Sequence, residues 1–460
     1  MGINRLYNEA ALTDLRARED NAFARRTSNS QAMTARARTS MPLGVPMAWM
    51  AGLHQTPPIY ILEGNESRFT DIDGNTYCDF NVADLSMTMG FGPAPIAKAV
   101  RKAVETGAHF LLPTENAVHV TEELARRCGL PFWQFTLSAS GANAEVIRIA
   151  RHLTGRERIV VFQGHYHGHI DEMLVEARNG QTVPGFAGVS PDAAAKTIIL
   201  PFNDLDRLEH VLASEEVALV ITEPALTNCG LVQPEPGFHE GLRGLTARYG
   251  TLLCYDEAHT FQFAYGGLKR AWQLESDFHV IGKGLGTGIS FALYGFSAEI
   301  ETELSHQQGT EVGPSGLPEG VATGGTTYAS ALATAVARAA LIEILTEENY
   351  TRIRALGARL ANGLDTLFAK HGLPWCAHRL GPRSGFCMRP DLPRDFDEAQ
   401  LSLDTLWIDT RRVYMANRGI WDAVSSAGPQ ASFAHAPEDI DLYLQVTDDF
   451  LSEIEWVIVT

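Results

Sequence analysis

Short apolar runs alternate with helical patterns through the middle of the chain. Runs of mostly β-branched and aromatic residues, each bounded by turn residues, predict strands at 132–139, 158–164, 197–202, 217–224, 251–258, 278–283 and 291–297. Between these runs, apolar residues at helical spacing predict helices at 142–153, 204–213 and 238–249. Continuous apolar strands separated by helices are typical of a mostly parallel sheet with helices on both faces. The pattern therefore predicts an α/β domain.

The segments on either side of this region follow different patterns. Alternating residues around Asp73-Gly74-Asn75 predict a β-hairpin at 68–80. A long alanine-rich helix near residue 335 leads into a stretch with fewer buried strands, which is typical of an α+β domain. We therefore expect three parts. They are an N-terminal arm with a segment of the small domain (1–75), a large α/β domain (76–330) and a smaller C-terminal α+β domain (331–460).

Composition limits the classes of partner. The chain has 460 residues, of which 45% are hydrophobic and 20% charged, as in globular proteins with a large core. Its 37 basic and 55 acidic side chains give a formal charge of −18, which argues against nucleic acid and anionic membranes as partners. The chain has no apolar signal segment at its start and no apolar run of about 18 residues. Its six cysteines form no CxxC pair. We expect a cytoplasmic protein with reduced thiols and no structural zinc.

Polar side chains gather where the predicted strands end, and ligands of open α/β sheets bind beyond the carboxyl ends of the strands. The segment Ser138–Asn143 ends one strand and opens a helix with hydroxyls and a glycine. It could bind an anion at the helix N-terminus, although an ordinary serine N-cap produces the same pattern. Asp256 ends another strand, where a carboxylate either caps the next helix or pairs with a cation such as a protonated ring nitrogen.

Lys283 ends a third predicted strand and lies among Gly282, Gly284, Gly286 and Gly288. Glycines allow the backbone to approach a ligand closely, and a partly desolvated lysine is suited to forming an imine with a carbonyl. A solvated lysine on a turn is the alternative interpretation.

Tyr166 follows the predicted strand 158–164, within the sequence FQGHYHGH. Its ring could stack on a flat cofactor. The alternating histidines His165, His167 and His169 lack a nearby carboxylate or cysteine, so they are a weak zinc pattern and we expect no metal.

These groups fit one ligand when they are taken together. The helix start would bind a phosphate, and Asp256 would pair with the protonatable nitrogen of a planar ring. Lys283 would react with an aldehyde. Pyridoxal 5′-phosphate has all three features, with the lysine holding its aldehyde as a Schiff base.

The motifs resemble those of the class III (subgroup II) aminotransferases of pyridoxal-phosphate fold type I, from about residue 30 to the C-terminus. The similar segments are DIDGNTYCDF, SASGANAE, FQGHYHGH, EPALTNCGLVQPEPGF, YDEAHT, GKGLGTG and GGTTYASALA. The resemblance implies the fold type I architecture, with a mostly parallel central sheet, helices on both faces and a smaller α+β domain. It also implies a homodimer whose subunits share their active sites.

Roles follow from the same resemblance. Lys283 would be the Schiff-base lysine and proton shuttle, Asp256 would pair with the ring nitrogen, and Tyr166 would stack on the ring. The backbone of 140–142 would bind the phosphate, Glu223 would orient the surroundings of the cofactor, and Thr326 would reach the phosphate of the neighbouring subunit. His259 stands where the family has Gln or Met. The full expected cofactor-binding set is Ser140, Gly141, Ala142, Tyr166, His167, Glu223, Asp256, His259, Lys283 and Thr326.

The regions that bind substrate in relatives depart from the family pattern. Many relatives hold a substrate carboxylate with an arginine near the C-terminus, whereas GPQASFAHAPEDIDLYL contains none. That ending resembles the glutamate-1-semialdehyde aminomutase branch, which uses an arginine in an N-terminal stretch instead. Trp49 and Met50 occupy that position here. We expect a substrate pocket formed by Trp49, Met50, Leu85 and Met87.

The main functional interpretation is a transaminase that moves an amino group from an apolar or aromatic amine, or a β- or ω-amino acid, to a keto acid such as pyruvate by ping-pong half-reactions. The alternative is an aminomutase, racemase or epimerase on the same scaffold, because all of these enzymes need the lysine and the cofactor. A third interpretation, a non-enzymatic cofactor-binding scaffold, is disfavoured because Lys283, Asp256 and Tyr166 occur together.

Overall fold

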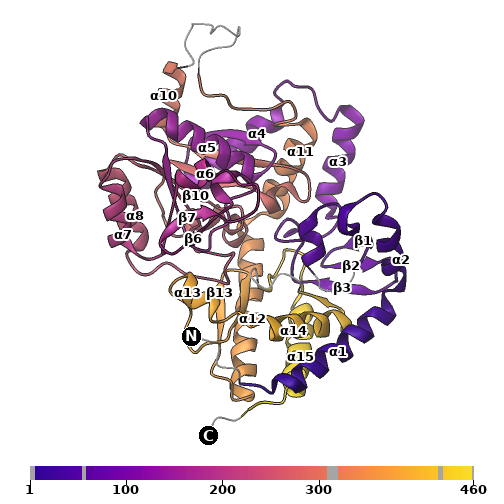
Figure 1. The fold of residues 1–460 in the computed structure, drawn as a ribbon. Coiled ribbons are helices and arrows are strands. Elements are labelled where there is room, and N and C mark those ends of the chain that lie inside the picture. Colours follow the sequence, from indigo (N-terminus) through magenta and orange to yellow (C-terminus); the bar gives the residue numbers. More distant parts are fainter. Residues whose placement is uncertain (1–5, 54–57, 308–319, 423–427, 458–460) are drawn as a thin grey trace. The chain divides into compact units, whose positions relative to one another are not determined.

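The computed structural model describes residues 6–53, 58–307, 320–422 and 428–457. The chain divides into two compact units. The large unit comprises 94–350 and 393–396, and the small unit comprises 1–93, 351–392 and 397–460 (Figure 1).

The large unit is built on a seven-stranded sheet. Its strands are β4 (Phe132–Thr136), β5 (Arg158–Phe162), β8 (Thr197–Leu200), β9 (Val217–Thr222), β10 (Leu252–Asp256), β11 (Phe278–Ile281) and β12 (Ala292–Phe296), in the order β4-β12-β11-β10-β9-β5-β8. Strands β8, β5, β9, β10 and β11 are parallel, whereas β12 runs antiparallel to both of its neighbours. Each predicted strand is confirmed as a member of this mostly parallel sheet.

Helices surround this sheet. They are α3 (Ala94–Thr106), α4 (Glu115–Cys128), α5 (Ala139–Thr154), α6 (Pro191–Ala195), α7 (Leu205–Leu212), α8 (Phe238–Arg248), α9 (Gly267–Ala271), α10 (Ala298–Gln307) and α11 (Ala331–Ala339). A hairpin of β6 (Val175–Arg178) and β7 (Gln181–Pro184) completes the unit. Helix α5 packs its buried face on the apolar strands, with Ile147 and Ile149 meeting Val161 and Ile221 in one core cluster.

The small unit is formed by segments from the N-terminal and C-terminal parts of the chain. Strands β1 (Ile61–Asn65), β2 (Arg68–Asp71) and β3 (Thr76–Asp79) form an antiparallel meander, and β15 (Ile420–Trp421) adds in parallel to β3. The predicted hairpin is thereby confirmed as β2–β3. The other elements are α1 (Glu9–Arg26), α2 (Ser28–Ala37), η1 (Pro42–Gly44), η2 (Ala48–Gly52), β13 (Cys376–Leu380), β14 (Arg383–Cys387), α14 (Thr405–Asn417) and α15 (Pro437–Glu453). Helix α12 (Glu347–Lys370) begins in the large unit, and the short α13 (Phe396–Gln400) follows β14.

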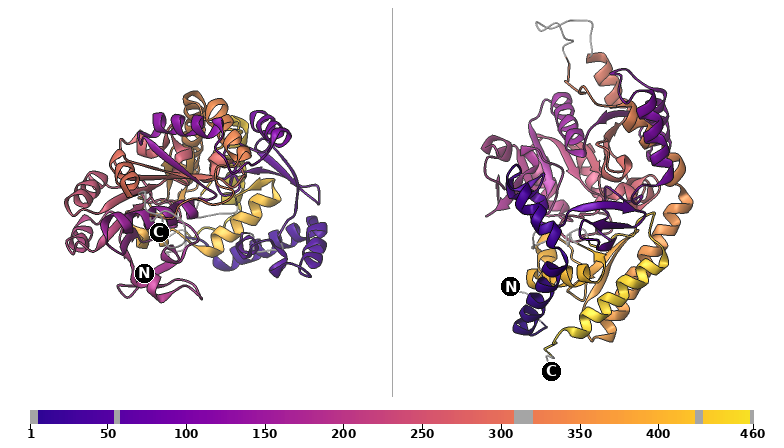
Figure 2. Two further views of the ribbon diagram at one scale, coloured as in Figure 1. Left: turned by 90° about the horizontal axis from the view of Figure 1, so that it is seen from above. Right: turned by 90° about the vertical axis from the view of Figure 1, so that its right-hand side faces the viewer.

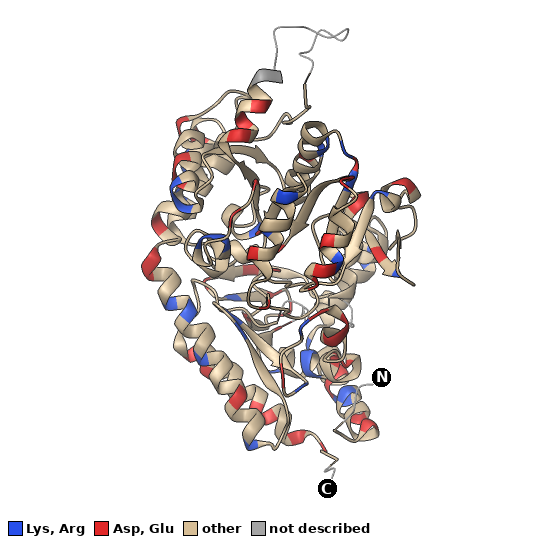
Figure 3. Cartoon of the chain, turned by 90° about the vertical axis from the view of Figure 1, so that its left-hand side faces the viewer, with Lys and Arg blue, Asp and Glu red and all other residues tan. Residues whose placement is uncertain are grey.

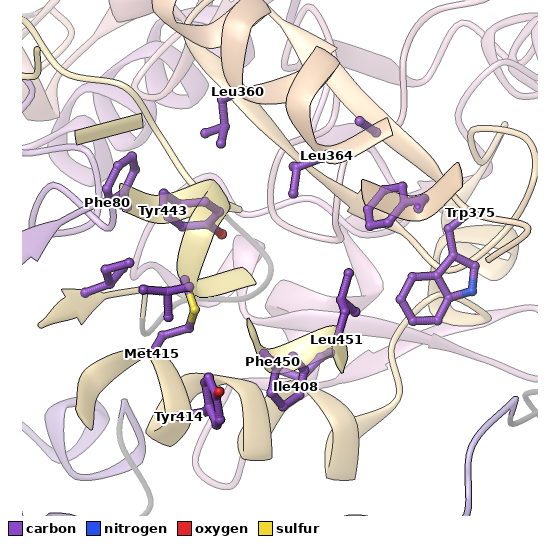
Figure 4. Close-up of a cluster of buried hydrophobic side chains, with 14 of the residues drawn as sticks. Phe80, Leu360, Leu364, Trp375, Ile408, Tyr414, Met415, Tyr443, Phe450 and Leu451 are labelled. Atoms are coloured by element: carbon purple, nitrogen blue, oxygen red, sulfur yellow. The ribbon is translucent and has the colours of Figure 1, made fainter. Parts of the chain in front are cut away.

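Aromatic and aliphatic side chains from these segments form the core of the small unit (Figure 4). Phe80 follows β3, Leu360 lies on α12, and both belong to one buried cluster with Tyr443 and Phe450 of α15. The rings of Phe80 and Tyr443 lie 4.6 Å apart, which is close contact for two aromatic side chains. This core therefore unites residues far apart in sequence.

The boundaries of the units differ from the predicted ones at 75/76 and 330/331. Strand β3 and the residues up to 93 stay with the small unit, because β3 pairs with β15. Helix α11 was predicted to open the C-terminal domain, but it packs on α3 and α4 and therefore belongs to the large unit.

Charged residues of both signs are interspersed along the helices (Figure 3). Two ion pairs, Arg359–Asp441 and Lys370–Asp448, join α12 to α15, which lie side by side (Figure 2). Among the described helices, none combines the length and the apolar character that crossing a membrane requires.

Candidate active site

The predicted site residues of the large unit follow four neighbouring parallel strands. Asp256 ends β10, Lys283 comes just after β11, and Glu223 comes just after β9. Tyr166 and His167 lie in the loop after β5. Because β11, β10, β9 and β5 are consecutive in the sheet and parallel, their carboxyl ends meet at one edge.

The backbone at Lys283 is held in an unusual conformation. Its φ is +46°, in the left-handed region that non-glycine residues rarely adopt. The preceding Gly282 packs against the start of α5, where an added Cβ would lie 3.2 Å from the Cβ of Ala139. The small residue thus brings the end of β11 close to α5 and sets Lys283 beside the N-terminus of that helix.

Asp256 is buried within a set of hydrogen-bond donors. Its Oδ2 accepts hydrogen bonds from His167 Nδ1 at 2.9 Å and Asn143 Nδ2 at 2.8 Å, and its Oδ1 accepts one from the backbone N–H of Ala258 at 2.9 Å. Burial alone would raise the pKa of this carboxyl, but the hydrogen bond and charge of His167, with the other two donors, lower it below its ordinary value. Asp256 therefore remains an anion in the interior.

Asn143 belongs to the segment predicted to bind an anion, but its contact with Asp256 was not predicted. It lies on α5, is fully buried, and also donates from Nδ2 to the backbone carbonyl of His167 at 2.8 Å. One amide thus ties the loop after β5 to the carboxylate at the end of β10. Its position three residues after Ser140, on the same face of a helix, was the available signal.

The N-terminus of α5 lies against the loop after β5. Ser138 is the N-cap and accepts the N–H of Gly141 at 3.1 Å. Ser140 Oγ accepts the N–H of His169 at 2.9 Å, and Gly168 approaches so closely that an added Cβ would lie 2.4 Å from Ser140 Oγ. Ala142 is buried in the core. Helix α5 begins at Ala139 with Ser138 as its N-cap, which confirms the predicted helix start in this segment.

Glu223 belongs to a buried chain of hydrogen bonds with two further side chains. Thr227 donates its hydroxyl to Glu223 Oε2 and its N–H to Oε1 at 3.3 Å. The hydroxyl of Thr227 also lies 2.7 Å from His259 Nδ1. Burial raises the pKa of Glu223 to about 7, despite opposing effects of His167 and Thr227. His259 is therefore linked to Glu223 through Thr227, a residue that the sequence did not single out.

The remaining predicted residues have varied surroundings. Tyr166 is 46% exposed, and Thr326 is exposed in a turn before α11. That turn lies near α5, since the hydroxyl of Tyr328 is 3.6 Å from the Cβ position of Gly141.

The four predicted pocket residues lie in the small unit. Trp49 and Met50 are exposed on η2, Leu85 is buried and Met87 is half-buried. Leu85 ends a run of four residues with positive φ, 82–85, so its backbone is strained.

A tight group of metal-ligand side chains occurs elsewhere. Within the described parts of the chain, Cys78, His435 and Asp439 bring potential ligand atoms within 4.8 Å of one another. Asp439 there caps α15 through the N–H of Ala436 and also pairs with the guanidinium of Arg68. A cation beside the carboxylate opposes metal binding, so we interpret this group as structural.

The geometry of the large unit fits pyridoxal phosphate. An ionised buried carboxylate suits a cationic ring nitrogen, and the start of α5 offers N–H groups to a phosphate. Three buried polar atoms, Asn143 Oδ1 on α5, His167 Nε2 in the loop after β5 and Thr287 Oγ1 four residues beyond Lys283, have no hydrogen-bond partner among the described residues, as expected for a site that receives a polar ligand.

Comparison with known sequences decides the family. The family model "Aminotransferase class-III" matches residues 50–374. The chain belongs to the class-III aminotransferases. The glutamate-1-semialdehyde 2,1-aminomutase of Persephonella marina is 32% identical over 414 residues, covering 86% of this chain and 92% of that protein. The predicted resemblance to this branch is confirmed.

Solved structures agree in fold. A variant glutamate-1-semialdehyde aminomutase from Pseudomonas aeruginosa in complex with PMP has a TM-score of 0.92 at 35% identity, covering 98% of this chain and 100% of that one. An ω-transaminase from Sphaerobacter thermophilus has a TM-score of 0.83 at 25% identity, with coverages of 92% and 97%. The fold and the cofactor predictions are confirmed, since PMP is the aminated form of pyridoxal phosphate. This class-III aminotransferase is a pyridoxal-phosphate-dependent enzyme.

Proposed function

We propose that this class-III aminotransferase is an aminomutase, which exchanges an amino group and a carbonyl group between neighbouring carbons of one substrate. The observation that carries the proposal is the full-length similarity to glutamate-1-semialdehyde aminomutases, with 98% of the chain aligned to the Pseudomonas aeruginosa enzyme at 35% identity. This supports the alternative interpretation of the sequence better than the main one, in which the amino group passes to a separate keto acid.

The proposed roles follow the geometry of the strand ends. When bound, pyridoxal phosphate would supply an electron sink for the carbon that exchanges its amino group. Asp256, kept ionised by its donors, would hold the ring nitrogen protonated. Lys283 would carry the aldehyde and move the proton at the reacting carbon, with its position fixed by the left-handed backbone next to Gly282.

The other residues would orient the cofactor. Ser140, Gly141 and Ala142 would present the start of α5 to the phosphate, and Tyr166 would lie on the ring. His167 would hold Asp256, and His259 with Glu223 would form a second buried group beside it. Thr326 would meet the phosphate of a neighbouring subunit in a homodimer, a state that sedimentation of the purified protein would test.

The substrate proposed first is an α-amino aldehyde like the one in the name of the relatives, glutamate 1-semialdehyde. A second function is favoured by one observation. Trp49 and Met50 stand where the aminomutase branch has an arginine, and an apolar pair lacks the bidentate fork that a carboxylate prefers. Transamination from an apolar or aromatic amine to pyruvate is therefore the second candidate.

The two functions differ in whether a co-substrate is needed. Purified holoenzyme is given glutamate 1-semialdehyde alone, and the isomer with the amino group on C1 is measured by mass spectrometry and NMR. An aminomutase converts the substrate without an added keto-acid acceptor, and its product retains the nitrogen of the substrate. Turnover that occurs only with an amine and pyruvate together would overturn the proposal and establish transamination. Release of a racemised but unrearranged substrate would indicate a racemase instead.

A further inference from the structure

Two of the six cysteines lie directly opposite each other in the small unit. Strands β13 and β14 are antiparallel, and their register pairs Cys376 with Cys387. The ladder continues through five residue pairs to Leu380 opposite Arg383, which are joined by a two-residue turn. The cysteine pair therefore lies at the open end of a hairpin, farthest from the turn.

The backbone spacing at this position suits a disulfide. Opposite residues of antiparallel strands have Cα atoms about 4.5 or 5.5 Å apart, and disulfides span about 4.4–6.8 Å between Cα atoms. The two side chains point to the same face of the hairpin and are hydrogen-bonded to each other. No large movement of the backbone is needed to join them.

The hairpin is held in this register by its surroundings. The N–H of Ala377, next to Cys376, donates to Asp365 Oδ1 of α12 at 2.8 Å. On the other strand, the sulfur of Cys387 lies 3.1 Å from Ser402 Oγ and 3.7 Å from the backbone carbonyl of Asp391. The backbone next to Cys376 and the sulfur of Cys387 are thus each held in place on the two paired strands.

The two thiols differ in exposure and in acidity. Cys376 is half-buried, whereas Cys387 is fully buried. Hydrogen bonds from Cys376, from Ser402 and from the N–H of Arg389 outweigh burial and lower the pKa of Cys387. The same hydrogen bond, with burial, raises the pKa of Cys376. A small reagent therefore meets Cys376 first, with a second sulfur of high thiolate character directly behind it.

We propose that Cys376 and Cys387 are a redox-modification site, which closes to an intrachain disulfide by exchange with a low-molecular-weight disulfide. Cys376 passes its proton to the sulfur of Cys387 and attacks one sulfur of the small disulfide, whose S–S bond breaks. The first small thiol leaves after taking a proton from water. The sulfur of Cys387 then attacks that of Cys376 and expels the second small thiol, which carries away the remaining proton. The protein loses two electrons and one proton, water supplies the second proton, and the small disulfide becomes two thiols.

The other four cysteines offer no such site. Cys78, Cys128, Cys229 and Cys254 are all buried, and burial is the first cause that raises the pKa of Cys78, Cys128 and Cys254. A buried thiol of raised pKa reacts poorly, so modification is expected at one pair only.

Peptide mapping tests this site on the full chain. The holoenzyme is incubated with excess oxidised glutathione, quenched with acid, alkylated under denaturing conditions and digested without reduction. We expect a peptide that links Cys376 to Cys387, replacing both alkylated peptides in most chains and disappearing after dithiothreitol. Two alkylated thiols after this treatment, or a glutathione adduct that persists on Cys376 while Cys387 is present, would overturn the proposal.

Variants separate the roles of the two sulfurs. Cys387→Ser is expected to accumulate the glutathione adduct on Cys376, because the resolving sulfur is gone. Cys376→Ser should leave Cys387 alkylatable, because glutathione does not reach it. Cys128→Ala removes a buried cysteine that has no opposite partner and should form the cross-link as the unaltered chain does. If a variant fails to fold, mapping of the unaltered chain alone still decides the question.

Discussion

His167 Nδ1 lies 2.9 Å from Asp256 Oδ2, and both side chains are buried. The contact joins the loop after β5 to the end of β10 across the intervening strand β9. It helps to keep the carboxylate ionised where burial alone would favour its protonated form. This pair therefore supplies the negative charge of the site that we assign to pyridoxal phosphate.

Replacing Asp256 by Asn tests this assignment. The amide keeps the shape of the side chain but removes its negative charge. The nitrogen of a bound pyridine ring then lacks the anion that stabilises its protonated form. We expect turnover to fall by several orders of magnitude while the protein remains folded. Steady-state kinetics and circular dichroism measure the two effects. Asp206→Asn, on the exposed face of α7, is the matched control and should behave as the unaltered enzyme. Near-normal turnover in Asp256→Asn would refute the role.

Gly168→Ala tests the close approach between the loop after β5 and α5. Gly168 has φ +111°, and a Cβ there would lie 2.6 Å from the Cα of Ser140. We expect the helix start to shift and the affinity for the cofactor to drop at least tenfold, as measured by absorbance titration.

Gly180→Ala is a matched control for the backbone strain. Gly180 also has a positive φ, +75°, but a Cβ there meets nothing within 4 Å. It should lower stability by about 1 kcal/mol and leave cofactor affinity unchanged. Equal affinity in the two variants would show that the contact with Ser140 does not position the helix start.

The buried Glu223 predicts a pH dependence of stability. Burial raises its pKa to about 7 in the folded protein, whereas an unfolded glutamate titrates near ~4.3. A carboxyl with a raised pKa holds its proton more tightly when folded. Its contribution is therefore fully present below about pH 4.3 and is lost as the pH rises through about 7.

Glu223→Gln removes this titration while keeping the side-chain shape. Between about pH 4 and pH 8, the free energy of unfolding of the unaltered protein should fall relative to the variant by up to roughly 3 kcal/mol. Urea unfolding of the cofactor-free proteins measures the difference, with the exposed Glu240→Gln as control. Parallel pH profiles for the unaltered protein and Glu223→Gln would contradict the raised pKa.

Much of the large unit could be predicted from the sequence. Its strands are buried and therefore appear as apolar runs, and its helices bury one face and therefore have apolar residues at helical spacing. The predicted strand 132–139 ends earlier, at Thr136, since Ser138 already caps α5. The division of the chain was harder to predict. The pairing of β15 with β3 and the packing of α11 on α3 join segments that are distant in sequence, and no local pattern encodes such contacts.

The site shows the same contrast. Asp256 and Lys283 could be predicted because they are charged residues at the ends of apolar strands. Burying a charge there is unfavourable unless a partner or a ligand compensates for the lost water. The link of Asn143 to Asp256 and the presence of Thr227 in the site were not predicted, because an amide on a helix and a hydroxyl in a loop are ordinary there. Their importance comes from their contacts with Asp256 and with Glu223 and His259, which only the fold creates.

The covalent attachment of the cofactor is the most direct test. The purified holoprotein is reduced with borohydride, digested and mapped by mass spectrometry. We expect a single pyridoxyl-phosphate adduct on Lys283, absent from Lys283→Ala but present in the control Lys102→Ala, which removes an exposed lysine on α3. An adduct on another lysine, or none in a yellow protein, would contradict this expectation.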